Sequence, residues 1–153
     1  MAKEIERKFL VINDSYRAQS SSSHTIVQGY LSTNPEATVR VRLYDDRGFI
    51  TVKSKNHGPE RHEWEYEIPE SDAIEMLGIC TCVLRKVRYN CGRWEIDEFG
   101  GRLNGLVVAE IELSDMDEVI TLPPFVGKEV TDDPGYYNSA LAAASQPPSV
   151  ASL

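Results

Sequence analysis

The sequence has no apolar run approaching the roughly 20 residues that a membrane-spanning helix needs. It also has no apolar signal segment at the N-terminus, because charged residues begin at Lys3. We therefore expect a cytoplasmic protein without a membrane partner. Positive charge is scarce as well: 16 Lys and Arg residues stand against 24 Asp and Glu residues, for a net charge of −8. A surface that binds nucleic acid needs a basic face, so we expect no nucleic-acid partner.

Cysteine and histidine are few, with three residues of each type. An odd number of cysteines without an export signal favours reduced thiols over a disulfide framework, and their C-x-C pattern is a poor zinc signal. The sequence also lacks the phosphate-binding G-x-x-x-x-G-K-[ST] loop, the G-x-S-x-G nucleophile motif and the H-E-x-x-H zinc motif. We therefore do not expect a P-loop nucleotide site or a site built on either of the other two motifs.

The chain does contain enough apolar residues for one core. Its 153 residues are 41% hydrophobic and 26% charged, which is typical of a globular domain. We expect one domain over residues 1–145. Residues 146–153 are rich in Pro and Ser, and we expect them to be a disordered tail.

Alternation of polar and apolar residues recurs in eight short segments that are separated by turn signals. In the first segment, Glu4, Glu6 and Lys8 share one face of a strand, and Ile5 and Phe9 share the other. This pattern predicts an α+β protein that is mainly β, either an antiparallel barrel or a sandwich. The expected strands cover residues 4–11, 25–32, 38–43, 49–54, 62–68, 83–89, 93–99 and 106–113.

Three short helices are expected beside these strands. They cover residues 13–19, 71–77 and 134–144. Ser71 is expected to cap the second helix, and Asp133 followed by Pro134 is expected to begin the third. Residues 127–131 are expected to be extended.

The polar faces of seven strands carry charges that are sorted by sign. The basic residues are Lys8, Arg40, Arg42, Lys53, Lys86 and Arg88. The acidic residues are Glu4, Glu6, Glu63, Glu65, Asp97, Glu110 and Glu112. A solvated sheet face explains any single strand. Over seven strands we favour a barrel whose apolar rows face outward beneath helices and whose charged rows line a polar tunnel. So many buried charges must pair with each other, with metals or with a ligand.

A lining of both signs is suited to phosphoryl transfer. Arg and Lys bind phosphate oxygens, and clustered carboxylates hold Mg²⁺ or Mn²⁺. A bound divalent metal also reverses the local charge, so an acidic protein can bind an anion. Six basic residues exceed what one phosphate needs, which indicates a chain of phosphates.

The first strand, Glu4-x-Glu6-x-Lys8, resembles the E-x-E-x-K signature of the CYTH superfamily, also called triphosphate tunnel metalloenzymes. The resemblance covers the chain to about Leu141. Its further segments are Gln28-Gly29-Tyr30-Leu31, Val39-Arg40-Val41-Arg42, Thr51-Val52-Lys53-Ser54, Glu63-Trp64-Glu65, Lys86-Val87-Arg88-Tyr89, Glu95-Ile96-Asp97, Glu110-Ile111-Glu112, Lys128-Glu129-Val130-Thr131 and Tyr137-Asn138.

This resemblance implies an eight-stranded antiparallel β-barrel whose tunnel binds a triphosphate with Mg²⁺ or Mn²⁺, two ions per site, and whose C-terminal helix closes one end. It assigns Glu4, Glu6 and Lys8 to catalysis. The six basic residues named above would hold the phosphates. The main metal ligands would be Glu4, Glu6, Glu110 and Glu112. The remaining acidic residues, which would serve a second metal or position water, are Glu63, Glu65 and Asp97.

The compact length and the opening segment resemble short bacterial members, many of which act on inorganic tripolyphosphate. We therefore expect metal-dependent hydrolysis of the terminal phosphate of tripolyphosphate. Within the same fold, the alternatives are a class IV adenylyl cyclase and a thiamine triphosphatase. A non-catalytic module that binds polyphosphate or nucleotide is an alternative of another class, although phosphate binding alone would not need so many carboxylates. A homodimer is a further arrangement that exposed apolar surface would support.

Overall fold

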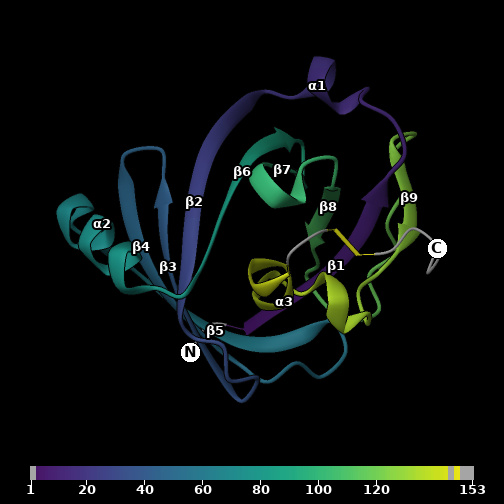
Figure 1. The fold of residues 1–153 in the computed structure, drawn as a ribbon. Coiled ribbons are helices and arrows are strands. Elements are labelled where there is room, and N and C mark those ends of the chain that lie inside the picture. The colour runs from purple at the N-terminus through teal and green to yellow at the C-terminus, as the bar shows by residue number, and fades with distance from the viewer. Residues whose placement is uncertain (1–2, 145–146, 149–153) are drawn as a thin grey trace.

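A computed structural model of the chain describes residues 3–144 and 147–148, and Figure 1 shows a ring of strands around a short helical segment. The fold is α+β and mainly β, as the sequence predicts. Among the described residues, nine antiparallel strands follow the order β5-β4-β3-β2-β6-β7-β8-β1-β9, and pairing of β5 with β1 closes the first eight into a barrel. The strands are β1 (Lys3–Val11), β2 (Ser22–Ser32), β3 (Ala37–Tyr44), β4 (Arg47–Ser54), β5 (Glu60–Ile68), β6 (Cys82–Cys91), β7 (Trp94–Phe99), β8 (Val107–Glu112) and β9 (Val126–Glu129).

Strand β1 closes the barrel, and along one of its edges it pairs with two different strands. One edge of β1 pairs with β8, while the other edge pairs first with β5 through Lys3–Ile5 and then with β9. Between these two pairings, Glu6 N donates to Pro59 O, and Val130 N donates to Lys8 O. The loop before β5 and the segment after β9 therefore meet the wall beside Glu6 and Lys8.

The helices are short, and none in the described part of the chain is long and apolar enough to cross a membrane. On the outside of the barrel, α2 packs against β3 and β4. The helical elements are α1 (Tyr16–Gln19), α2 (Glu70–Ile79), α3 (Asn138–Ala143) and the 3₁₀ turns η1 (Gly101–Leu103) and η2 (Pro134–Tyr136).

Two expectations about the helices were wrong. A continuous helix over 134–144 does not form, because Tyr137 is extended (φ −64°, ψ 140°) and separates η2 from α3. The carbonyl of Tyr136 accepts a hydrogen bond from Lys8 Nζ at 2.6 Å, which takes the place of a helical partner. Ser71 makes no capping hydrogen bond, since α2 begins one residue earlier, after Pro69.

The outward apolar rows form one buried cluster on the exterior of the barrel wall. Ile5 and Phe9 of β1 pack there with Trp94 of β7, as the alternation predicts. Tyr16 of α1 and Phe125 of the segment before β9 cover this cluster. The exterior of the wall near β1, β7 and β8 is therefore a core rather than a solvated face.

A second apolar cluster fills one end of the barrel interior. Leu84 and Phe99 lie on the same strand faces as Lys86, because residues two apart or directly opposite share a face. Tyr136 of η2 and Leu141 of α3 pack into this cluster, and Figure 1 shows α3 within the ring of strands. The interior is therefore apolar at the end that the C-terminal segment closes and charged at the other, whereas the sequence predicts charged rows alone.

Candidate active site

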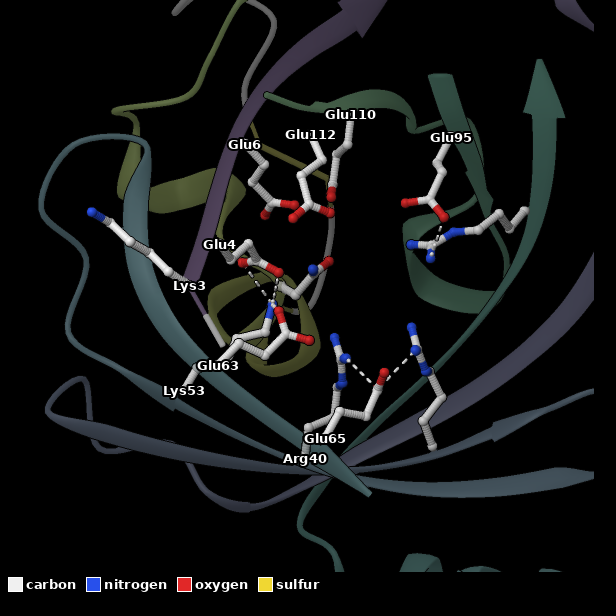
Figure 2. Close-up of a pocket in the computed structure, with 13 residues that line it drawn as sticks. Lys3, Glu4, Glu6, Arg40, Lys53, Glu63, Glu65, Glu95, Glu110 and Glu112 are labelled. Atoms are coloured by element: carbon white, nitrogen blue, oxygen red, sulfur yellow. Dashed lines mark hydrogen bonds and ion pairs between the residues drawn. The ribbon is translucent and has the colours of Figure 1, made fainter. Parts of the chain in front are cut away.

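The charged side chains line a cavity of about 370 Å³ inside the barrel, and Figure 2 shows them pointing into it from opposite walls. Three of the predicted residues, Lys8, Lys86 and Asp97, do not line this cavity. The predicted residues that do line it are Glu4, Glu6, Arg40, Arg42, Lys53, Glu63, Glu65, Arg88, Glu110 and Glu112. The structure thus brings together residues from six strands that are far apart in the sequence.

Strand register places the acidic residues of β1 and β8 side by side. Glu6 lies opposite Glu112, and Lys8 lies opposite Glu110, with 3.5 Å between Lys8 Nζ and Glu110 Oε1. Figure 2 shows the carboxylates of Glu6, Glu110 and Glu112 directed toward one another. We call these three residues the acidic wall.

The acidic wall has more carboxyl groups than its own cations hold in the ionised form. Burial, with the charges of Glu110 and Glu4, raises the pKa of Glu6 to about 8. Burial also raises the pKa of Glu112, with a contribution from Glu4. Burial acts in the same direction on Glu110, but the charges of Lys8, Lys86 and Arg88 outweigh it and lower its pKa to about 2. The wall therefore attracts a further cation near Glu6.

The opposite wall carries two buried arginines from β3. Arg42 Nη2 donates to Glu65 Oε1 at 3.0 Å, and the same carboxylate oxygen accepts from Thr51 Oγ1 at 2.8 Å. Arg40 Nη2 donates to Thr51 Oγ1 at 3.3 Å. The Nε atoms of Arg40 and Arg42 are buried without a partner among the described residues. Burial and the neighbouring charges of Arg40 and Arg88 lower the pKa of Arg42 to about 10. Both guanidinium groups line the cavity, so an anion bound there would face two cations.

Glu4 joins the two walls. Lys53 Nζ lies 3.2 Å from Glu4 Oε1 and 3.8 Å from Glu63 Oε2. Arg61 Nε also donates to Glu4 Oε1, at 3.4 Å. Burial raises the pKa of Glu4, while Lys53 opposes this effect, and the hydrogen bond that protonated Glu4 donates to the Glu63 carboxylate raises the pKa further. Glu4 and Glu63 thus form a carboxyl pair held by two cations.

Asp97 lies beyond the cavity lining, with a side chain that is 2% exposed. It accepts from Arg88 Nε at 2.8 Å and from Arg88 Nη2 at 2.9 Å, and Lys86 Nζ lies 2.8 Å from its Oδ2. The Lys86 ammonium makes no well-oriented hydrogen bond among the described residues and lies 5.5 Å from the centre of the Phe99 ring. Although burial acts against the charged carboxylate, Arg88 and Lys86 hold the pKa of Asp97 well below its usual range. Asp97 therefore orients two basic side chains.

The cavity and its edges include four residues that the sequence analysis did not assign to the site. Glu95 pairs with Arg88 at 3.3 Å and stands two positions before Asp97, so strand alternation could have identified it. Lys3 and Arg61 lie just outside the expected strands, where no alternation signals a face. Asn138 comes from the segment that closes the barrel, and no local pattern aims it at the cavity.

No three carboxylate, histidine or cysteine side chains in the part of the chain that the structure describes are arranged to ligate a metal as a group. The donor chemistry nevertheless fits a hard divalent cation, which prefers carboxylate oxygen. The raised pKa of Glu6 supports this fit, because a cation beside the acidic wall would stabilise the ionised form. Glu6, Glu110 and Glu112 are therefore the residues that would hold such an ion.

The sequence matches the model of the CYTH domain over residues 2–139. The chain belongs to the CYTH domain family. Two similar relatives are inorganic triphosphatases, one from Acetivibrio thermocellus, 44% identical with 92% of this chain and 94% of the relative covered, and one from Nitrosomonas europaea, 36% identical with 91% and 96% covered.

Solved structures share the fold of this chain. The crystal structure of an inorganic triphosphatase is 32% identical, with a TM-score of 0.66 over 92% of this chain and 98% of the other. A structure titled as a putative adenylyl cyclase from Hippeastrum is 17% identical, with a TM-score of 0.54 over 73% of this chain and 80% of the other, and shows the fold alone.

Proposed function

We propose that this CYTH domain hydrolyses the terminal phosphate of inorganic tripolyphosphate in its barrel cavity. The observation that carries the proposal is that an acidic wall without enough cations and a wall of buried arginines face each other across the cavity. The raised pKa of Glu6 indicates that the acidic wall lacks a cation, and the opposite wall presents the guanidinium groups of Arg40 and Arg42 to the cavity. A polyphosphate with divalent cations would neutralise both walls at once.

The basic residues bind and orient the phosphate chain. Arg40 and Arg42 would donate from one side, and Arg88, oriented by Asp97, from the other. Guanidinium groups suit this role, because their planar donors match phosphate oxygens. Lys53 would add an ammonium beside Glu4, while Lys8 and Lys86 would act from behind the lining. Positioning and electrostatic stabilisation supply most of the catalysis in phosphoryl transfer.

The acidic residues would hold Mg²⁺ or Mn²⁺, two ions per site, and Glu4 and Glu6 with Lys8 would form the catalytic set. Bound divalent ions neutralise phosphate charge and polarise the bond that breaks. Glu110 and Glu112 would complete one ion site with Glu6. Glu63 and Glu65, which already contact Lys53 and Arg42, would support a second ion or orient water. For Asp97 the contacts with Arg88 and Lys86 favour an orienting role over that of a metal ligand.

The alternatives within the fold receive less support. The described lining of the cavity consists of charged side chains and one amide, with no aromatic residue to stack an adenine or thiamine ring. An adenylyl cyclase or a thiamine triphosphatase would need such a contact. A module that only binds polyphosphate would not need the acidic wall.

Phosphate release tests the proposal directly. We expect Mg²⁺- or Mn²⁺-dependent release from tripolyphosphate that exceeds release from ATP or thiamine triphosphate and stops with a chelator. Glu6→Gln should reduce the rate by about 100-fold or more, because the acidic wall loses a charged ligand. Glu67→Gln is the control, since Glu67 is an exposed strand residue paired with Arg47 outside the cavity. Production of cyclic AMP from ATP without phosphate release from tripolyphosphate would overturn the proposal, and so would binding without turnover.

A further inference from the structure

Asn138 is a buried amide at the inner end of the cavity with no partner for its oxygen. Its residue is 7% exposed, and its Oδ1 makes no hydrogen bond with any described residue. The backbone around it is fixed, because Leu141 packs into the interior apolar cluster and Lys8 Nζ holds the Tyr136 carbonyl. A buried amide oxygen without a partner costs free energy of about 1–3 kcal/mol, so such groups are usually satisfied by water or ligand.

Two small chambers adjoin the cavity at Asn138. One chamber, of about 30 Å³, is lined by Glu4 and Glu6. The other, of about 10 Å³, is lined by Arg40 and Lys53. Among the described residues, Asn138 alone lines the cavity and both chambers.

The size and polarity of the chambers suit water. A site for one water needs roughly 10–15 Å³ of such space and two to four polar partners. A phosphate group, with five heavy atoms, is too large for either chamber. Behind both chambers, Arg61 and Tyr137 border a wider surface pocket of about 510 Å³. The two chambers therefore lie between the cavity and this surface pocket, behind a phosphate chain that fills the cavity.

We propose that Asn138 is a positioning residue that holds the attacking water at the inner end of the barrel cavity. This inference rests on the proposed function. The water donates one hydrogen bond to Asn138 Oδ1, which leaves a lone pair directed at the phosphate held by Arg40 and Lys53. Its oxygen bonds to the terminal phosphorus, the bond from phosphorus to the bridging oxygen breaks, and pyrophosphate leaves with that oxygen. The proton that the attacking water loses passes to the oxygen of the departing pyrophosphate.

The test combines kinetics with a crystal structure. Asn138→Leu keeps a similar volume but removes the acceptor, and we expect its kcat for tripolyphosphate to fall about 10- to 100-fold, because the reacting atom is no longer held in place. KM should change by less than about twofold, since water rather than phosphate is affected. Asn138→Ser, whose hydroxyl can accept from water, should retain more activity. Asn104→Leu, at an exposed turn, is the matched control. In a crystal structure of the wild type, water should lie within hydrogen-bond distance of Asn138 Oδ1, and Asn138→Leu should lose it.

Each alternative result has a definite meaning. Unchanged kcat in Asn138→Leu would overturn the water role. A parallel rise in KM would overturn it too, because Asn138 would then bind phosphate directly. If Asn138→Leu does not fold, Asn138→Ser and Asn138→Ala carry the same comparison. A wild type that releases no phosphate from tripolyphosphate would refute the proposed function, whereas an active wild type with an unimpaired Asn138→Leu would refute the water role alone.

Discussion

Asp97 with its partners Arg88 and Lys86, which we call the Asp97 cluster, and the acidic wall both contain buried carboxyl groups. The pKa of Asp97 is lowered, whereas that of Glu6 is raised. Asp97 has two cations within 2.8 Å and a pKa far below the usual range. Glu6, two strands away along the same stretch of barrel wall, has carboxylates as neighbours, and its pKa is raised to about 8. Both lie on inward strand faces, so burial alone does not distinguish them. The comparison indicates that Asp97 serves the folded barrel, whereas Glu6 is completed by a ligand.

The largest loss of stability that we expect comes from removing the charge of Asp97, whose cations are paired with it. Asp97→Asn would leave Lys86 buried without its carboxylate partner and Arg88 with only the partly exposed Glu95, which should lower the free energy of unfolding by about 3–5 kcal/mol. Urea unfolding followed by circular dichroism measures this loss. A variant as stable as the wild type would show that the Asp97 cluster is not structural.

For Glu6 in the acidic wall, we expect a smaller effect, which is a change of the free energy of unfolding with pH. The folded-state pKa of Glu6 lies above its unfolded value of 4.5, so the folded protein holds a proton that the unfolded chain has lost. Without metal, the contribution of Glu6 to the free energy of unfolding should therefore be fully present below about pH 4.5. It should be lost as the pH rises toward about 8. Glu6→Gln should reduce this slope. Denaturant midpoints in chelator at several pH values make the measurement, and an equal slope in both proteins would contradict it.

An exposed pair gives the smallest effect and sets the baseline. Glu67 and Arg47 pair at 2.7 Å, but both side chains are more than half exposed. Solvent and salt screen such pairs, so Glu67→Gln should leave the unfolding midpoint unchanged within error. A clear loss of stability would mean that charge pairing alone, without burial, explains the Asp97 cluster.

The alternation of polar and apolar residues predicted the strands that carry Asp97 and Glu6. It did not predict which charged residues face each other across the strands. The eight expected strands all form, because each has apolar residues that must be buried, and in seven of them a charged row shares the other face. Which charges meet depends on cross-strand register. Arg88 lies opposite Asp97, and Glu6 lies opposite Glu112. A single sequence does not contain that register.

The apolar end of the interior and the position of Asn138 also depend on tertiary structure. Leu84 and Phe99 share strand faces with charged residues, so alternation assigns them to the charged row. Asn138 lies at the cavity because the expected helix is interrupted at Tyr137, beside the Tyr136 carbonyl that accepts a hydrogen bond from Lys8. The extent of the domain, residues 1–145, the homodimer and the cytoplasmic location stay predictions. The expected tail, 146–153, lies outside the described residues except for Pro147 and Pro148.

The measurement that tests the central claim most directly is Mn²⁺ binding at pH 7, followed by the electron paramagnetic resonance of free Mn²⁺ together with the protons released. Glu6 is largely protonated at that pH without metal, so binding at the acidic wall should release a proton from it. The wild type and Glu67→Gln should bind Mn²⁺ with proton release, and Glu6→Gln should bind more weakly and release fewer protons. Equal binding and equal proton release by Glu6→Gln would contradict the assignment of the acidic wall as the cation site.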